Sequence, residues 1–146
     1  MATGWIIRKI IEAVGIKLPP GDETGRMVIP GVTAIAYAAN DAMSIQWKVP
    51  CPKGSILSCA TYYDLSDLNV QVNLVISREL FGTAIAPDAQ FDVPNVDELK
   101  IDYELQFTVP TDHLTSRSFY LDHIGRDLKF PKGFCYLQLW TPAAQT

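Results

Sequence analysis

The sequence predicts an all-β protein, an antiparallel β-sandwich of about eight strands preceded by one short amphipathic helix. Three observations lead to this class. Apolar and polar residues alternate over residues 99–109, turn-forming residues recur about every ten residues from residue 28 onward, and helical spacing is confined to residues 1–14. A chain of 146 residues is long enough to bury the core of a single domain.

The clearest element is the segment 99–109. Its odd positions are all apolar, whereas its even positions include Lys100, Asp102 and Glu104. Successive side chains of a strand point to opposite faces, so this pattern gives one apolar and one polar face. A helix would bury the same charged side chains without partners. We therefore expect a strand at the centre of the fold, with an apolar layer opposite its odd-numbered face.

Further strands are expected where short apolar runs lie between Pro, Gly, Asn and Asp. These runs cover residues 32–39, 45–49, 56–63, 70–76, 81–86, 118–124 and 134–140, with a shorter piece at 91–93. The prolines fall between the runs, where a missing N–H removes no ladder hydrogen bond.

The last of these strands is apolar on both faces. Tyr136 and Trp140 lie on one face, Cys135, Leu137 and Leu139 lie on the other, and Gln138 is the polar exception. One face should meet the core. We expect the other, with Tyr136 and Trp140, to contact a neighbouring subunit or the N-terminal helix, because an apolar second face indicates oligomerisation.

The first residues differ from the rest. Ile6, Ile7, Ile10, Ile11 and Val14 recur at helical spacing, and a connector rich in Pro and Gly follows. We therefore divide the chain into an N-terminal arm, residues 1–26, and a β-sandwich domain, residues 27–146. The helix can fold onto its own domain or reach a neighbouring subunit or another protein.

Composition and charge disfavour several classes of partner. The formal net charge is −4 at pH 7, and Lys and Arg are spread along the chain, so we expect no nucleic-acid binding. No apolar run approaches the length of a membrane span, and the polar face of the N-terminal helix is short with only two basic residues, so we expect no membrane contact. Cys51, Cys59 and Cys135 lack metal-binding spacing and are expected to be buried free thiols.

Catalytic patterns are weak. His113 and His123 each follow an aspartate, but adjacent strand residues point to opposite faces and no nucleophile motif accompanies them. Both histidines are therefore expected on the surface, and His123 could also lie at a subunit contact. We expect no enzymatic activity and no cofactor.

Acidic groups are better explained by turns than by metal. Asp64, Asp67 and Asn69 could coordinate calcium, but they lack the spacing of a calcium loop, and Asp and Asn are common in turns. Asp97 and Glu98 precede Lys100 and are expected at a solvated strand start. No metal site is expected.

Aromatic residues permit a second interpretation, because lectin-like sites stack rings against sugars. Trp47 shares a predicted strand face with Ile45 and Val49, which favours the core. A carbohydrate-binding module instead predicts that Tyr62, Tyr63 or Trp140 is exposed.

The order of features over residues 44–141 resembles that of small jelly-roll proteins of tailed bacteriophages. The resemblance rests on the run Ile45-Gln46-Trp47-Lys48-Val49-Pro50 with its glycine turn and Tyr-rich strand, the alternating strand 99–109, the Arg126-Asp127 step, and the final strand 134–140. Several such proteins are cement or decoration proteins, commonly trimeric, and others occur in tail fibres. The resemblance implies a jelly-roll-like sandwich.

It also implies a function. We expect a structural virion protein, made in the host cytoplasm, that binds the outside of a phage head as a homotrimer and stabilises contacts between major capsid subunits. The alternative is a carbohydrate- or receptor-binding module of a tail fibre. The residues expected to make the contacts are Trp5, Ile6, Ile10 and Val14 in the arm, and Tyr136 and Trp140 in the last strand.

Overall fold

The computed structural model of the chain describes residues 29–32, 36–54, 56–57, 59–65, 67–69 and 71–144. The predicted arm and its contact residues Trp5, Ile6, Ile10 and Val14 lie outside these ranges. The regular secondary structure of the described residues is almost entirely strands in antiparallel sheets, with very little helix, so the predicted all-β class is confirmed.

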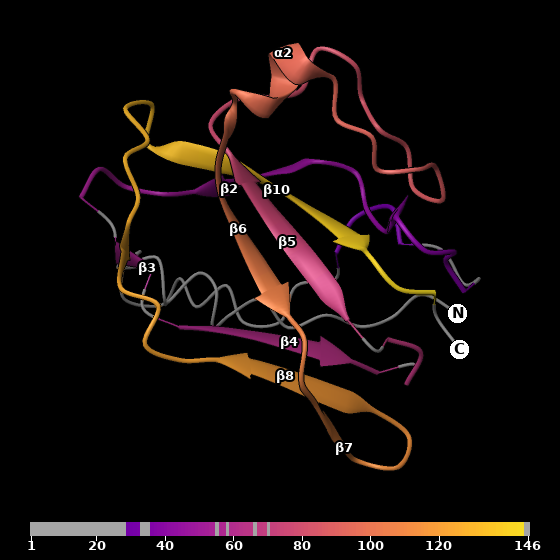
Figure 1. Cartoon of the computed structure of the whole chain (residues 1–146). Coiled ribbons are helices and arrows are strands. Elements are labelled where there is room, and N and C mark those ends of the chain that lie inside the picture. Colours follow the sequence, from indigo (N-terminus) through magenta and orange to yellow (C-terminus); the bar gives the residue numbers. More distant parts are fainter. Residues whose placement is uncertain are drawn as a thin grey trace.

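The larger sheet has five strands, all antiparallel (Figure 1). They are β1 (Asp41–Ala42), β2 (Trp47–Pro50), β5 (Val72–Ser77), β6 (Ile101–Phe107) and β10 (Phe134–Thr141). One side of β10 pairs with β1 and then β2, and its other side pairs with β5. The far side of β5 pairs with β6, which forms the edge.

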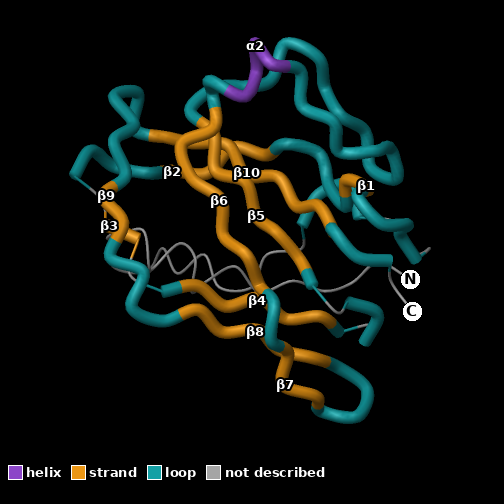
Figure 2. The backbone as a smooth tube through the Cα atoms, viewed as in Figure 1, coloured by secondary structure: helices purple, strands orange, loops and turns teal. Residues whose placement is uncertain are grey.

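Two smaller sheets complete the strand inventory. The first joins β4 (Ala60–Asp64), β8 (Arg117–Leu121) and β7 (Pro110–Asp112), and the second joins β3 (Ile56–Leu57) and β9 (Arg126–Asp127). Figures 1 and 2 show β4 and β8 as a layer of their own below the larger sheet. The molecule is therefore layered, sheet against sheet.

The main core fills the space between these layers. Trp47 and Val49 from the larger sheet are 8% and 3% exposed, which confirms that Trp47 is a core residue. From the smaller sheet, Tyr62 and Phe119 have ring centroids 5.4 Å apart. Phe107 of β6 meets both rings, at 5.8 Å and 6.4 Å, and so ties the two layers together.

The predicted position of the strand within 99–109 is wrong in one respect. The strand exists as β6, but it lies at the edge of its sheet, and Leu99 and Val109 beyond its ends are each 80% exposed. The central strand β5, Val72–Ser77, is buried at all six positions. The physical reason is that regular alternation requires one face to be in water, whereas a central strand here is covered on both faces.

Other predicted strands are also corrected. Within the described residues, 36–39 and 81–86 contain no strand. The run 56–63 is divided between β3 and β4, which belong to different sheets. Buried residues of the unpaired runs, such as Tyr37, Phe81 and Ile85, fill the core or cover a sheet without joining a strand, and periodicity alone cannot distinguish that use from a strand.

The segment 78–100 forms a further layer over the outer face of the larger sheet (Figure 1). It contains α2 (Asn95–Glu98), and its apolar residues join a second buried cluster. That cluster contains Ala42, Val75, Phe81 and Ile85, with Phe91, Val93, Ile101 and Trp140 packed against it. None of the helices in the described ranges is both long and apolar enough to cross a membrane.

The cysteines are free thiols, as predicted. Cys51 and Cys135 are buried, and Cys59 is partly exposed. A hydrogen bond with Cys51, together with burial, raises the pKa of the Cys135 thiol far above its usual range. The Cys135 thiol therefore stays protonated and unreactive at neutral pH.

Candidate interaction site on the outer face of the larger sheet

The candidate site is the outer face of β10, where the sequence places Tyr136 and Trp140. Phe134, Tyr136, Gln138 and Trp140 alternate with core residues along this strand. Of the four, Gln138 is buried and the three aromatic residues are half-buried. The prediction that this strand is largely covered on both faces is therefore confirmed.

Trp140 is covered by the chain's own segment 78–100. Its ring stacks on Phe91, with centroids 5.2 Å apart and planes at 14°. The indole Nε1 donates a hydrogen bond of 3.2 Å to Oε1 of Glu104, and Asn73 Nδ2 donates to the same oxygen at 3.0 Å. Internal contacts thus account for much of the Trp140 surface, and a contact with a partner stays a prediction.

Glu104 is a carboxyl group of this face whose pKa is shifted. Burial raises the pKa of Glu104 above its usual value, and the hydrogen bonds from Asn73 and Trp140 oppose that rise. From the sequence, Glu104 was expected only to lie on the polar, solvent-facing side of a strand. Because the raised pKa comes from burial, which depends on the packing of segments far apart in the chain, no local sequence signal identifies it.

Tyr136 lies on the same face and is half-buried like Trp140. Its ring meets Phe134 edge to face, with centroids 5.8 Å apart and planes at 87°. Lys48 Nζ of β2 lies 3.8 Å from the centroid of the Phe134 ring, a cation–π contact. Tyr136, Phe134 and Lys48 thus form an aromatic and cationic surface beside the covered Trp140.

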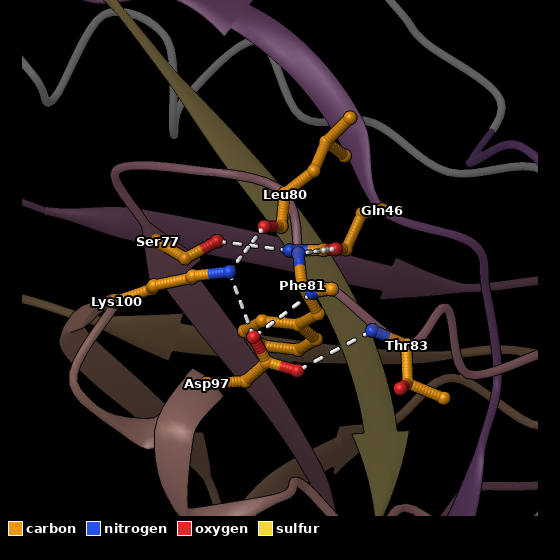
Figure 3. A network of polar contacts seen from close by, with 8 residues as sticks. Gln46, Ser77, Leu80, Phe81, Thr83, Asp97 and Lys100 are labelled. Atoms are coloured by element: carbon orange, nitrogen blue, oxygen red, sulfur yellow. Dashed lines mark hydrogen bonds and ion pairs between the residues drawn. The ribbon is translucent and has the colours of Figure 1, made fainter.

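Asp97 ties two parts of the covering segment to each other (Figure 3). Its Oδ1 accepts a hydrogen bond of 2.9 Å from the backbone N–H of Gly82, and its Oδ2 accepts one of 3.4 Å from Thr83. Lys100 Nζ pairs with Oδ1 at 2.8 Å and donates to the carbonyl of Leu80 at 3.1 Å. The Gly82 N–H and the Lys100 side chain hold the pKa of Asp97 below its usual value.

The expectation that Asp97 marks a solvated strand start is wrong. Asp97 is 1% exposed and lies in α2, where it accepts hydrogen bonds from a segment 14 and 15 residues earlier in the chain. A carboxylate can be buried where N–H groups and a cation satisfy it. Those donors come from tertiary structure, which spacing along the sequence does not reveal.

Two glutamines supply further anchors. Gln46 Nε2 donates to Ser77 Oγ at 3.0 Å, while its Oε1 accepts from the N–H of Phe81 at 2.8 Å (Figure 3). Gln138 Nε2 donates to the carbonyls of Ser44 at 2.9 Å and Ile85 at 3.1 Å. The covering segment is therefore held at both its start and its middle.

The acidic loop after β4 is occupied by protein donors. Asp64 Oδ2 accepts the N–H groups of Leu68 and Asn69, each at 2.8 Å. Arg117 Nε pairs with Asp67 Oδ1 at 2.7 Å. Across the described ranges, no group of three or more His, Cys, Asp or Glu side chains is arranged to hold a metal ion.

The two histidines lie on the surface, as predicted. Both are exposed. His113 Nε2 lies 2.8 Å from Ser118 Oγ, and His123 adopts a positive φ of 56° in the turn after β8.

The aromatic residues of β4 differ in exposure. Tyr62 is 2% exposed, so a ligand at the surface cannot contact its ring. Burial raises the pKa of the Tyr62 hydroxyl. Tyr63 is half-buried and meets Tyr120 edge to face at 6.2 Å. Tyr120 is 51% exposed and was not singled out from the sequence, although its position outside the core face of its strand is a usable signal.

Comparisons of this chain with known protein families, with curated proteins and with solved structures found no match.

Proposed function

We propose that this chain is a structural virion protein, a cement or decoration protein that binds the outside of a phage head. In this proposal it assembles as a homotrimer and stabilises contacts between major capsid subunits without catalysing a reaction. Its mechanism is adhesion, because burying apolar surface at about 25 cal/mol per Å² in many copies resists internal pressure.

The order of the strands supports a jelly-roll-like sandwich, an architecture that is common in viral capsid domains. A jelly roll with strands numbered from 1 to 8 places 1-8-3-6 in one sheet and 2-7-4-5 in the other. The larger sheet here has the order β2-β10-β5-β6, and β4 pairs with β8 opposite it. This agrees with 1-8-3-6 and 2-7. Segment 78–100 occupies the position of strands 4 and 5 in the chain order, but it packs on the outer face of the larger sheet instead of extending the smaller one.

The observation that carries the adhesive role is the half-buried aromatic surface on β10. Phe134 and Tyr136 lie beside the cation of Lys48 on a sheet face that the covering segment leaves partly open. Aromatic residues are enriched at protein interfaces. In this proposal the arm residues Trp5, Ile6, Ile10 and Val14 add a second grip on a neighbouring subunit or on the shell.

The test is the copy number of this chain in purified virus particles, measured by quantitative mass spectrometry. We expect hundreds of copies, in a simple ratio to the major capsid protein. Tyr136→Ala should then lower occupancy on isolated heads, whereas the matched control Tyr120→Ala, an exposed tyrosine on the smaller sheet, should not. Absence of the chain from particles would refute the proposal.

The alternative function is a carbohydrate- or receptor-binding module of a tail fibre. The Tyr63–Tyr120 pair favours it, because Tyr120 presents an exposed ring that could stack on a sugar. It predicts a few copies per particle and saturable glycan binding that Tyr120→Ala abolishes. Tyr62 contributes nothing to such a site, since it is buried in the core.

A further inference from the structure

The positive charges of the described residues are divided unevenly. Of their eight lysines and arginines, Lys100 and Arg117 form ion pairs with Asp97 and Asp67. The other six form no ion pair with a described carboxylate. We call their surface the cationic end; it consists of Lys48, Lys53, Arg78, Arg126, Lys129 and Lys132.

Part of the cationic end lies at the start of β10. Lys48 covers the Phe134 ring at 3.8 Å. Beside that ring is a hollow of about 130 Å³ that is lined by Arg78, Lys132 and Phe134. Residues far apart in the sequence thus bring three cations to one aromatic side chain.

The remaining cations continue this surface. Lys53 and Lys129 line a hollow of about 340 Å³ next to Pro131. Lys129 also lines a hollow of about 430 Å³ with Arg126. Three acidic residues, Glu79, Asp102 and Asp127, line the same hollows. Because the cationic end has six positive side chains and these three negative ones, its net charge is positive.

The opposite end of β10 is acidic. Asp41 of β1 pairs with Thr141, and the segment containing Asp88 and Asp92 lies directly beside β1. The N–H of Asp88 donates to the carbonyl of Ala42 at 2.9 Å, and Asp41 forms an isolated bridge with Gln90. Asp41 is half-buried, and Asp88 and Asp92 are exposed. We call these three carboxylates the acidic edge.

The two surfaces lie at opposite ends of β10. β10 runs from the cationic end at Phe134 to the acidic edge at Thr141, and an eight-residue strand spans roughly 23 Å. At that distance the charges do not neutralise each other at physiological salt, where the Debye length is about 8 Å. Each molecule therefore presents two surfaces of complementary charge, and neither forms an ion pair with the other among the described residues.

We propose that copies of this chain associate head to tail, with the cationic end of one copy against the acidic edge of the next. Such a heterologous contact forms a ring when the rotation between copies closes, and an open chain when it does not. The contact deepens and rests on the proposed function, because it names the surfaces through which a homotrimer would form.

A second copy fits these observations better than a nucleic acid. Every copy carries both complementary surfaces, whereas the chain as a whole has a net charge of −4 and repels a polyanion. Charge complementarity of this kind directs association and selects the partner more than it adds affinity. The contact is therefore expected to be sensitive to salt.

The test is sedimentation velocity of the full chain at about 50 mM and about 500 mM sodium chloride, the higher salt shortening the Debye length about threefold. We expect association at low salt and an apparent Kd at least about tenfold weaker at high salt. Lys129→Glu with Lys132→Glu makes both ends acidic, and Asp92→Lys with Asp88→Asn removes the acidic edge. Asn suits position 88, where φ is 68°.

Neither double variant should associate alone, but a mixture of the two should, because it again pairs opposite charges. The matched control is Asp122→Lys with Asp112→Asn, which changes two exposed acids elsewhere by the same charge and should associate like the natural chain. The proposal would be overturned if the apparent Kd were the same at both salt concentrations and in both double variants. It would also be overturned if the mixture of the two variants stayed monomeric. Heparin binding by a chain that stays monomeric would assign the cationic end to a polyanion instead.

These outcomes are separable from the proposed function. The copy number in particles tests the virion role and does not depend on association in solution. If heads carry hundreds of copies while the solution experiment fails, the decoration role stands and the head-to-tail contact is wrong.

Discussion

Gln138 provides the sharpest test of how the covering segment is held. It is 1% exposed, and its amide Nε2 donates to the carbonyls of Ser44 and Ile85. The change Gln138→Met keeps nearly the same volume but removes both donors. Because Ile85 belongs to the covering segment 78–100 and Ser44 to the approach to β2, one substitution weakens both attachments.

The magnitude follows from the hydrogen bonds. Each buried carbonyl left without a donor costs about 1–3 kcal/mol, so two cost about 2–6 kcal/mol. Methionine also removes the buried Oε1, which has no hydrogen-bond partner among the described residues, and this returns about 1–2 kcal/mol. We expect the free energy of unfolding to fall by about 2–3 kcal/mol, which corresponds to a decrease of roughly 6–9 °C in Tm.

The assay is urea unfolding followed by tryptophan fluorescence, together with hydrogen exchange of the segment 78–100. The control is Gln106→Met on β6, an exposed position where we expect a change below about 0.5 kcal/mol. Exchange should accelerate in 78–100 before it does in β5. If Gln138→Met is no more destabilising than Gln106→Met, the described hydrogen bonds do not anchor the segment.

Three further predictions concern charge and packing. Burial raises the pKa of Glu104, so its ionised form opposes folding, and the free energy of unfolding falls as pH rises from the ordinary pKa of 4.5 through the raised one. Glu104→Gln should therefore increase the free energy of unfolding by up to about 1 kcal/mol at pH 7 and leave it unchanged at pH 4. Urea unfolding measures this gain, which the partial exposure of Glu104 limits. Asp97 has the opposite sign, because its lowered pKa stabilises the fold above the ordinary value of 3.8 and this contribution is lost as pH falls through the lowered one. The amide proton of Gly82 should report that titration by NMR with a midpoint below 3.8, and a midpoint above it would contradict the described contact. Phe119→Ala should cost about 3–5 kcal/mol in thermal unfolding because Phe119 is fully buried between the sheets, whereas Tyr120→Ala should cost less than about 1 kcal/mol.

The covering segment changes how the predicted oligomer surface is understood. The sequence indicated that β10 is buried on two faces and assigned the second face to a partner or to the helix. Much of that cover is internal, since Phe91 stacks on Trp140 and Gln138 binds the carbonyl of Ile85. Apolar residues on the second face of a strand therefore predict that this face is covered, whereas only the tertiary structure shows that segment 78–100 of the same chain covers much of it.

Local pattern alone determined the class and several of its elements. The alternation around Leu105 predicted β6, and the spacing of Trp47 and Val49 predicted a buried face of β2. These predictions succeeded because the side-chain period of a strand is a property of the backbone, independent of its neighbours.

Tertiary structure alone decided where these elements lie and what their polar groups meet. It placed β6 at an edge, buried Asp97 beneath backbone donors, and raised the pKa of Glu104. It also brought positive side chains from β2, from Arg78 and from the loop before β10 together near the start of β10, although they are far apart in the sequence. Burial, hydrogen-bond satisfaction and electrostatic fields depend on distances in space, and those are set only when distant segments pack together.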